Sequence, residues 1–220
     1  MQTVHFKKHV PDPMNYLEKE EMKALRAAPD QKAAQGFRDY ALLLFLYNTG
    51  ARASEASHLK IGDLDLVSPV ATLHGKGRRV RQCPLWKLTA TTLRRLVGNR
   101  TASQEVFVNR YGQPLTRYGI HTLVKRHTRR AAVTAPTLRT KRVSPHTIRH
   151  ATAMSLLRAG VDINTIRIWL GHAVLQTTNI YAESDLKMKA EALARCEAPL
   201  LHPGKKPTAQ KGLMGFLTMI

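Results

Sequence analysis

The sequence predicts an α+β fold that is mainly α-helical and carries one small antiparallel β-sheet. Segments with helical periodicity and recognisable caps occupy both halves of the chain, and three short strand-like segments lie between them. The chain has 220 residues, of which 43% are hydrophobic, so it is long enough and apolar enough to bury a core.

The N-terminal helices are predicted at residues 17–28, 37–48 and 53–59. The first is polar and amphipathic and stops at Pro29, because proline lacks the backbone donor that a helix interior needs. The second is apolar nearly all round, so we expect it inside the core. Gly50 follows it and suits a helix C-cap.

The strands are predicted at residues 63–66, 70–73 and 80–85. A Ser-Pro pair at 68–69 separates the first two, and a Gly-Lys-Gly turn at 75–77 separates the second from the third. Such short connections favour antiparallel neighbours.

The rest of the chain is predicted to be helical, apart from a short extended piece at 106–109. The expected helices cover residues 88–97, 118–133, 145–159, 162–170, 177–182 and 186–197. Ser144 suits the N-cap of the helix at 145–159, and Pro145 suits its first position. Gly160 and Gly171 are expected to close this helix and the next one.

The charge of the chain is strongly and unevenly positive. Lys and Arg number 35 against 15 Asp and Glu, which gives a net charge of +20. Residues 75–161 carry nineteen basic side chains and one acidic side chain, Glu105, whereas residues 1–74 balance at nine of each. A concentrated basic region predicts a polyanionic partner; the alternative is a solvated basic face.

Several classes of protein are disfavoured. The longest apolar run, 40–47, is too short to span a bilayer, and the N-terminus lacks the pattern of a secretory signal. Cys83 and Cys196 provide neither a disulfide framework nor a four-ligand zinc site. We therefore expect a cytoplasmic protein with two reduced thiols and no membrane partner.

The first candidate motif is Thr-Gly-Ala-Arg-Ala-Ser-Glu at 49–55. The guanidinium of Arg52 offers a rigid fork of donors that matches two phosphate oxygens, and Glu55 could hold that fork in position. Taken alone, such an Arg–Glu pair on a helix is more often structural.

The second candidate is Lys76, between Gly75 and Gly77 at the turn of the expected hairpin. A lysine there can reach away from the sheet and can donate a proton to a leaving oxygen if its pKa is lowered. The alternative is a basic hairpin that only touches phosphates.

The third candidate is His146 with Arg149, three residues apart on one face in the first turns of a helix, where the N-terminus favours an anion. His150 follows His146 by four residues, a spacing that also occurs in zinc sites on helices. A zinc site is disfavoured, however, because no Glu lies between the two histidines and no third ligand is evident. A capped helix with an incidental His and Arg is the alternative.

The last candidates are His172, directly after the helix-closing Gly171, and Tyr181, nine residues later. A His after a helix end can face a cleft. A tyrosine more often packs with its hydroxyl hydrogen-bonded, so core packing is the alternative for Tyr181.

Together and in this order, the motifs resemble the tyrosine recombinase family of phage integrases, Xer proteins and Cre-like enzymes. That family shows a Thr-Gly-x-Arg-x-Ser-Glu motif, a lysine in a Gly-Lys-Gly-like hairpin, His-x-x-Arg, Leu-Gly-His and then a tyrosine. This sequence matches at 49–55, Lys76, 146–149, 170–172 and Tyr181, and the resemblance covers about residues 15–198. It implies the catalytic-domain fold of that family.

The resemblance implies a role for each matched residue. Tyr181 is expected to attack the scissile phosphodiester and to form a 3′-phosphotyrosine, and Lys76 to protonate the departing 5′-oxygen. Arg52 and Arg149 are expected to bind the non-bridging oxygens. His146 is expected to act in proton transfer or in positioning the nucleophile, His172 to hydrogen-bond the phosphate, and Glu55 to support the site from behind.

The chemistry agrees with these roles. Free tyrosine, with a pKa of about 10, needs activation and stabilised charge on phosphorus. Two arginines and a helix N-terminus can supply that charge, so no metal and no other cofactor is expected. The expected partner is double-stranded DNA. Its further contacts are expected from basic side chains at Arg78, Arg79, Arg81, Lys125, Arg126, Arg129, Arg130, Lys141 and Arg142.

The domain organisation follows from the resemblance. Residues 1–16 are expected to be a leader or linker, 17–198 the catalytic domain and 199–220 a tail that docks on a neighbouring protomer or is frayed. The N-terminal core-binding domain of the family is expected to be absent, which would weaken DNA binding. A tetramer on DNA, a monomer when free, and association with the nucleoid are expected.

Two other functions fit parts of the sequence. A type IB topoisomerase-like enzyme would share the chemistry without exchanging strands, although the Leu-Gly-His motif favours a recombinase. A DNA-binding-only protein would use the helices at 145–159 and 162–170 as a helix-turn-helix unit or be a degenerate integrase remnant. The helix-turn-helix reading explains the charge but not Arg52, Lys76 and Tyr181 in their places.

Overall fold

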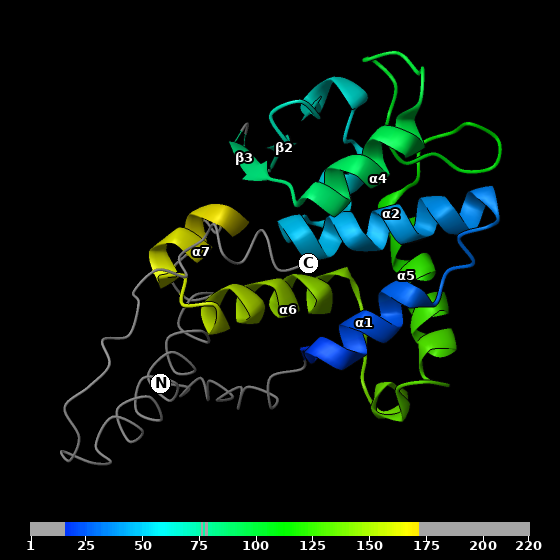
Figure 1. Cartoon of the computed structure of the whole chain (residues 1–220), viewed down its shortest axis with the longest axis vertical. Helices are drawn as coiled ribbons and strands as arrows, with labels where there is room; N and C mark the ends of the chain where they lie inside the picture. Colours follow the sequence, from blue (N-terminus) through cyan, green and yellow to red (C-terminus); the bar gives the residue numbers. More distant parts are fainter. Residues whose placement is uncertain (1–15, 76, 78, 172–220) are drawn as a thin grey trace, which may run out of the picture.

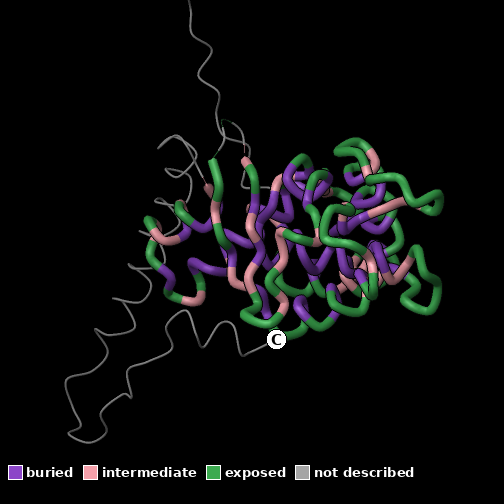
Figure 2. Tube along the Cα trace, turned by 90° about the horizontal axis from the view of Figure 1, so that it is seen from above, coloured by how far each residue is buried: buried purple, intermediate pink, exposed green. Residues whose placement is uncertain are grey.

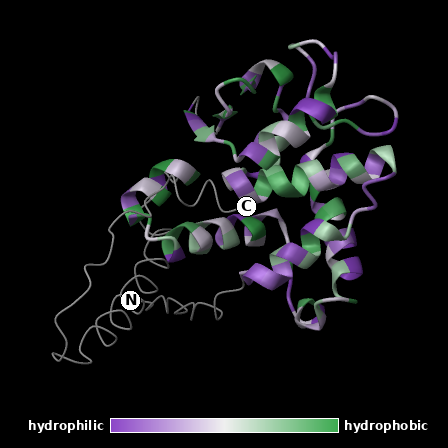
Figure 3. Ribbon diagram, viewed as in Figure 1, coloured by the Kyte–Doolittle hydropathy of each residue, from purple (hydrophilic) through white to green (hydrophobic). Residues whose placement is uncertain are grey.

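Helix α2 (Ala34–Thr49) runs through the centre of the computed structural model, which describes residues 16–75, 77 and 79–171 (Figure 1). All side chains from Ala41 to Leu46 are fully buried, as expected for a helix that is apolar nearly all round. Figure 3 shows the hydrophobic colour along the middle of this helix. The buried rings of Phe45 and Phe107 pack with their centroids 5.7 Å apart.

The other helices pack on α2 or on one another (Figure 1). They are α1 (Lys19–Ala27), α3 (Ala53–Ser57), α4 (Lys87–Val97), α5 (Arg117–Ala131), α6 (Pro145–Arg158) and α7 (Ile163–Leu170), with 3-10 turns η1 (Ile61–Asp63) and η3 (Pro136–Arg139). In Figure 2 the buried segments gather inside and the exposed segments form the outer loops. None of the helices within the described ranges is long and apolar enough to cross a membrane.

The sheet has three antiparallel strands in the order β1 (Leu64–Asp65), β2 (Val70–His74) and β3 (Val80–Pro84). In the β2–β3 register, Ala71 pairs with Cys83 and Leu73 with Arg81. Side chains two residues apart on a strand share a face, so Arg81 lies on the same face as the buried Cys83. The exposed Val80 points to the other side.

A second, smaller cluster of buried side chains joins α6 to α7. It includes Leu156, Leu157, Ile166, Trp169 and Leu170. Helix α7 contacts both α6 and β3, so its C-terminal end lies where the helical part meets the sheet (Figure 1). At this end of α7 the carbonyl oxygens of Leu170 and Gly171 accept hydrogen bonds from Arg149 and Arg52, which line the cleft described below.

The predicted fold class, mainly α with a small antiparallel sheet, is confirmed. Residues 106–109 form no strand; one isolated bridge pairs Val108 with Pro114, and a second pairs Lys60 with Glu105 just before this segment. The two 3-10 turns were not predicted. The helices expected at 177–182 and 186–197 lie outside the described residues.

Candidate active site

A cleft of about 230 Å³ opens where three helices begin. Its described lining comes from the starts of α3, α5 and α6, and consists of Arg52, Ala53, Ser54, Arg117, His121, Pro145, His146 and Arg149. Within the part of the chain that the structure describes, no acidic side chain lines it. Backbone N–H groups and the positive end of the dipole at the start of a helix attract anions, so the cleft suits a phosphate.

Arg52 reaches the cleft because the chain turns sharply between α2 and α3. Gly50 ends α2 in the left-handed conformation, with φ of +60°, and places Arg52 at the N-cap of α3. A Cβ atom on Gly50 would lie 2.4 Å from Cδ2 of Leu170, so packing as well as conformation requires glycine. The Arg52 side chain remains 41% exposed toward solvent.

Glu55 is the buried anion that organises the basic residues behind the cleft. Its side chain is 2% exposed and accepts four hydrogen bonds of 2.8 Å, from the backbone N–H of Arg52, from Nη1 of Arg52, and from Nη1 and Nη2 of Arg81. Burial alone would raise the pKa of Glu55, but the hydrogen bonds and charge of Arg81, together with the bonds from Arg52, lower it to about 2. The carboxylate is therefore ionised across the physiological range.

Arg149 projects from the first turns of α6, whose start is fixed as the sequence predicts. Ser144 accepts a hydrogen bond from the backbone N–H of Thr147, and Pro145 occupies the first helical position. Arg149 is 2% exposed; its Nη1 donates to the carbonyl oxygen of Gly50 at 2.6 Å and its Nη2 to that of Leu170. These bonds hold the guanidinium at the wall of the cleft.

His146 lies one turn before His150, and the two rings meet edge to face with centroids 4.4 Å apart. Burial, together with the charges of Arg149 and Arg52, lowers the pKa of His146. Burial, His146 and Arg149 lower the pKa of His150 to about 4. Both rings are thus held neutral near pH 7, and a neutral imidazole can accept a proton.

The structure brings Arg52, His146 and Arg149 together around one cleft and places Glu55 behind them. The candidates Lys76, His172 and Tyr181 lie outside the described residues. Gly75, which precedes Lys76 in the chain, packs against Glu55, since a Cβ atom on it would lie 3.4 Å from Oε1. Among the described residues no group of three His, Cys, Asp or Glu side chains could hold a metal ion.

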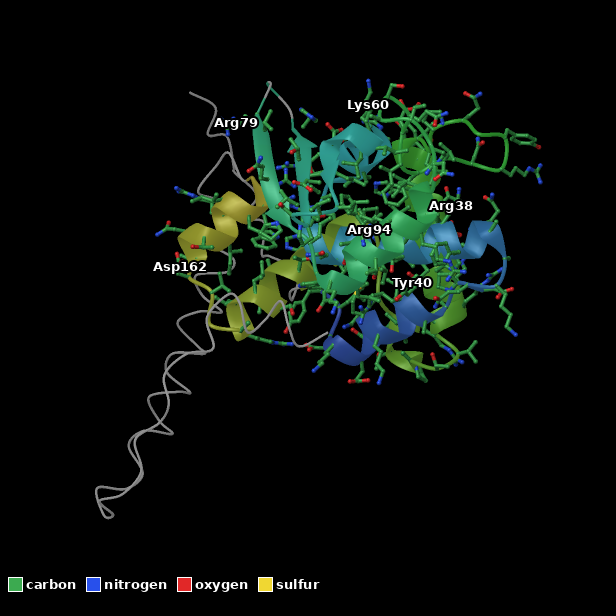
Figure 4. All side chains as sticks on the ribbon, turned by 45° about the horizontal axis from the view of Figure 1, so that its top comes forward. Arg38, Tyr40, Lys60, Arg79, Arg94 and Asp162 are labelled. Carbon is green, nitrogen blue, oxygen red and sulfur yellow. The ribbon has the colours of Figure 1, made fainter. Side chains whose placement is uncertain are left out.

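The basic residues expected to contact DNA occupy three different settings. Arg79 lies exposed at the outer end of the β2–β3 hairpin (Figure 4), and Arg78 is outside the described residues. The remaining exposed members lie on α5 or near the start of α6. They are Lys125, Arg126, Arg129, Arg130 and Arg142. Of these, Arg126 also pairs with the buried Asp39.

One of those expectations needs correction, and a second residue of the set is already paired within the protein. The Arg81 side chain is only 10% exposed and faces Glu55, because it compensates the buried carboxylate, so its guanidinium is not presented to DNA. Lys141 pairs with Glu21 at 2.6 Å and donates to the carbonyl oxygen of Tyr16, so it links η3 and α6 to α1. The charge of Arg81 is therefore largely buried, whereas the charge of Lys141 is paired but remains partly exposed.

Arg117 and His121 line the cleft but were not singled out from the sequence. They lie one turn apart at the start of α5, whose N-cap Thr116 accepts a hydrogen bond from the backbone N–H of Gly119. Their four-residue spacing directly after an N-cap was the available signal. It was hidden because the whole helix is basic.

The fold places the chain among the solved catalytic domains of tyrosine recombinases. The chain superposes on the XerA recombinase with a TM-score of 0.67 at 28% identity, covering 84% of this chain and 66% of that one. It superposes on the XerH site-specific recombinase, solved in a post-cleavage complex with its palindromic difH substrate, with a TM-score of 0.66 at 27% identity. That match covers 84% of this chain and 54% of XerH.

The chain belongs to the phage integrase family, whose model matches residues 15–188. It is 36% identical over 210 residues to a putative integrase/recombinase, y4rC, of Sinorhizobium fredii, covering 94% of this chain and 63% of that protein. It is 33% identical over 188 residues to the tyrosine recombinase XerD of Staphylococcus haemolyticus, covering 82% and 61%. The chain thus spans about three fifths of the length of these relatives. The family resemblance inferred from the motifs is confirmed.

Proposed function

We propose that this chain is the catalytic part of a site-specific tyrosine recombinase, which cuts and rejoins double-stranded DNA through a 3′-phosphotyrosine at Tyr181. The observation that carries the proposal is the cleft that gathers Arg52, His146 and Arg149 at the starts of α3 and α6. Two findings support it: the chain belongs to the phage integrase family, and the crystal structure of the related XerH contains its DNA substrate.

The cleft residues suit the chemistry of phosphoryl transfer. Arg52 and Arg149 bind the non-bridging oxygens of the scissile phosphate and stabilise the charge that grows on them. Their guanidinium groups are already held by Glu55 and by backbone carbonyl oxygens, so little reorganisation is needed when DNA arrives. Glu55 positions Arg52 and does not touch the phosphate.

The proton and bond changes balance around Tyr181. The phenolic oxygen forms a bond to phosphorus as its proton passes to His146, whose lowered pKa keeps the ring neutral and able to accept it. The bond between phosphorus and the 5′-oxygen breaks, and Lys76 supplies the proton that this oxygen takes up. His172 donates a hydrogen bond to the phosphate. Religation reverses these steps and needs no ATP, because the phosphotyrosine keeps the energy of the broken bond.

The wider setting is also part of the proposal. Residues 17–198 are the proposed catalytic domain, with a leader or linker at 1–16 and a tail at 199–220 that either docks on a neighbouring protomer or is frayed. The protein is monomeric when free, forms a tetramer on two duplexes and works in the cytoplasm at the nucleoid. It needs no metal and no nucleotide cofactor, because cationic side chains and helix N-termini supply the positive charge.

The test is covalent capture of DNA. The protein is incubated with nicked suicide duplexes built from candidate flanking sequences, in EDTA, and resolved on a denaturing gel beside Tyr181→Phe and Arg149→Ala. A covalent band that disappears in Tyr181→Phe is expected. A native-gel shift with no covalent band from any duplex would favour a DNA-binding-only protein. A covalent band accompanied by supercoil relaxation without strand exchange would favour a type IB topoisomerase-like enzyme.

A further inference from the structure

Three consecutive backbone carbonyls end α7, and each accepts a hydrogen bond from an arginine of a different part of the fold. The pairs are Arg81 Nε with the oxygen of Trp169 (2.9 Å), Arg149 Nη2 with that of Leu170, and Arg52 Nη2 with that of Gly171 (3.2 Å). The last carbonyls of a helix lack partners within the helix and carry its negative dipole end, so cationic donors stabilise them.

Arg81 differs from the other two arginines because it is not among the described lining residues of the cleft. It lies on β3 and its side chain is 10% exposed. Two of its nitrogens donate to the two oxygens of Glu55, and its third donates to Trp169. One rigid guanidinium therefore joins the sheet, the start of α3 and the end of α7.

The same carboxylate that Arg81 holds also holds Arg52. Oε1 of Glu55 accepts from Nη1 of both arginines at 2.8 Å. Loss of Arg81 removes two of the four hydrogen bonds to Glu55 and leaves a buried carboxylate that is only partly compensated. Arg52, whose side chain is 41% exposed, makes the two hydrogen bonds that remain and can then reorient toward that carboxylate.

Gly171 shows that Arg81 packs directly on the end of α7. A Cβ atom on Gly171 would lie 3.1 Å from Cδ and 3.2 Å from Nη1 of Arg81. The residue also has a φ of +64°, which closes the helix and leads into the segment that carries His172 and Tyr181. Arg81 therefore contacts the last described residue before that segment.

We propose that Arg81 is a positioning residue of the recombinase reaction, which fixes Arg52 through Glu55 and fixes the end of α7 through Trp169. The predicted effect of Arg81 on the reaction rate rests on the proposed function, whereas its predicted effect on the position of Arg52 does not. Arg81 acts from inside the protein and contributes no charge to the DNA surface. Its removal should therefore impair the chemical step and leave DNA affinity almost intact.

The test compares the wild-type chain with Arg81→Met, Arg81→Lys and the matched control Arg158→Met. Arg158 also forms a two-donor ion pair with a glutamate, Glu18, but at the opposite end of α6 from the residues that line the cleft. Three quantities are measured below the melting temperature of each variant. They are the single-turnover rate of covalent adduct formation at saturating protein, the Kd for the same duplex, and the position of the Arg52 Nε–H signal in arginine-selective ¹⁵N NMR.

We expect Arg81→Met to slow adduct formation roughly 10- to 100-fold, as misplacement of a reacting group does, with Kd changed less than about threefold. Arg81→Lys, which keeps the charge but cannot reach Glu55 and Trp169 together, should be intermediate. Arg158→Met should match the wild type. The Arg52 signal should move in Arg81→Met and stay in place in Arg158→Met.

An unchanged Arg52 signal in Arg81→Met would overturn the proposal, whatever the rates. A rate loss in Arg81→Met no larger than in Arg158→Met would overturn it too. If the wild-type chain itself forms no adduct, the proposed function fails separately, and the NMR comparison still decides whether Arg81 positions Arg52.

Discussion

Nη1 of Arg149 donates a hydrogen bond to the carbonyl oxygen of Gly50 across 2.6 Å. This bond ties α6 to the turn that presents Arg52, so the two arginines of the cleft share one support. The turn depends on the absence of a side chain at Gly50, where both the left-handed backbone and the nearby Leu170 exclude one.

Gly50→Ala should therefore destabilise the fold more than the same change at another left-handed glycine. Gly160 is the matched control, because its φ is +83° but nothing lies within 4 Å of an added Cβ. Gly160→Ala should cost about 1 kcal/mol from backbone strain alone, and Gly50→Ala about 1 to 3 kcal/mol more from crowding of the buried Leu170. Urea unfolding measures both; equal losses would contradict the packing argument.

Glu55 should contribute stability that is lost only in strong acid. Its folded pKa, about 2, lies below its ordinary value of 4.5, so the contribution is complete above pH 4.5 and disappears as the pH falls toward 2. The size is about 3 kcal/mol. In Glu55→Gln this part of the pH dependence of the unfolding free energy should vanish. A variant curve that runs parallel to the wild type between pH 4.5 and 2 would disprove the assignment.

His150 should affect stability in a different and higher pH window. Its folded pKa, about 4, lies below its ordinary value of 6.5, so the folded state favours the neutral ring. Stability is then complete above pH 6.5 and falls, by up to about 3 kcal/mol, as the pH drops from 6.5 to 4. His150→Gln should flatten the curve in this window. Titration of the ring protons by NMR gives the pKa directly, and a value near 6.5 would rule the effect out.

Arg117 should contribute to DNA binding from the wall of the cleft. Arg117→Ala should weaken binding and reduce the slope of log K against log salt by about 1, as the loss of one phosphate contact does. Arg110 is the matched control. It stacks on Tyr111 much as Arg117 stacks on Tyr118, with distances of 4.7 and 4.6 Å from the guanidinium carbon to the ring centroid, but it does not line the cleft. Equal slopes for the two variants would show that Arg117 makes no specific contact.

Local signals in the sequence predicted the elements well. Ser144 and Pro145 fixed the start of α6, and Gly50 and Gly171 were correctly expected to end α2 and α7, because caps depend on a few adjacent residues. The grouping of Arg52 with His146 and Arg149 followed only from the family resemblance, since these residues are far apart in sequence.

The role of Arg81 was missed for a physical reason. It sits in a run of basic residues that suggests a surface, and only the two-residue period from Arg81 to the buried Cys83 indicates an inward face. Its partner Trp169 is engaged through a backbone carbonyl, which every residue possesses. Contacts to backbone carbonyls do not depend on residue type, so the sequence cannot predict them and only the structure reveals them.

The end of α7 has a consequence for how this protein can change over generations. Asp162 caps the helix by accepting from the backbone N–H groups of Asn164 and Thr165, and is labelled in Figure 4. Insertion of a single residue between this cap and Gly171 would rotate the terminal carbonyls by about 100° and advance them by about 1.5 Å, away from all three arginines. Substitutions at outward positions such as Ile168, which is 70% exposed, leave the direction of these carbonyls unchanged. Helix α7 can therefore accept substitutions on its exposed face but no insertion or deletion.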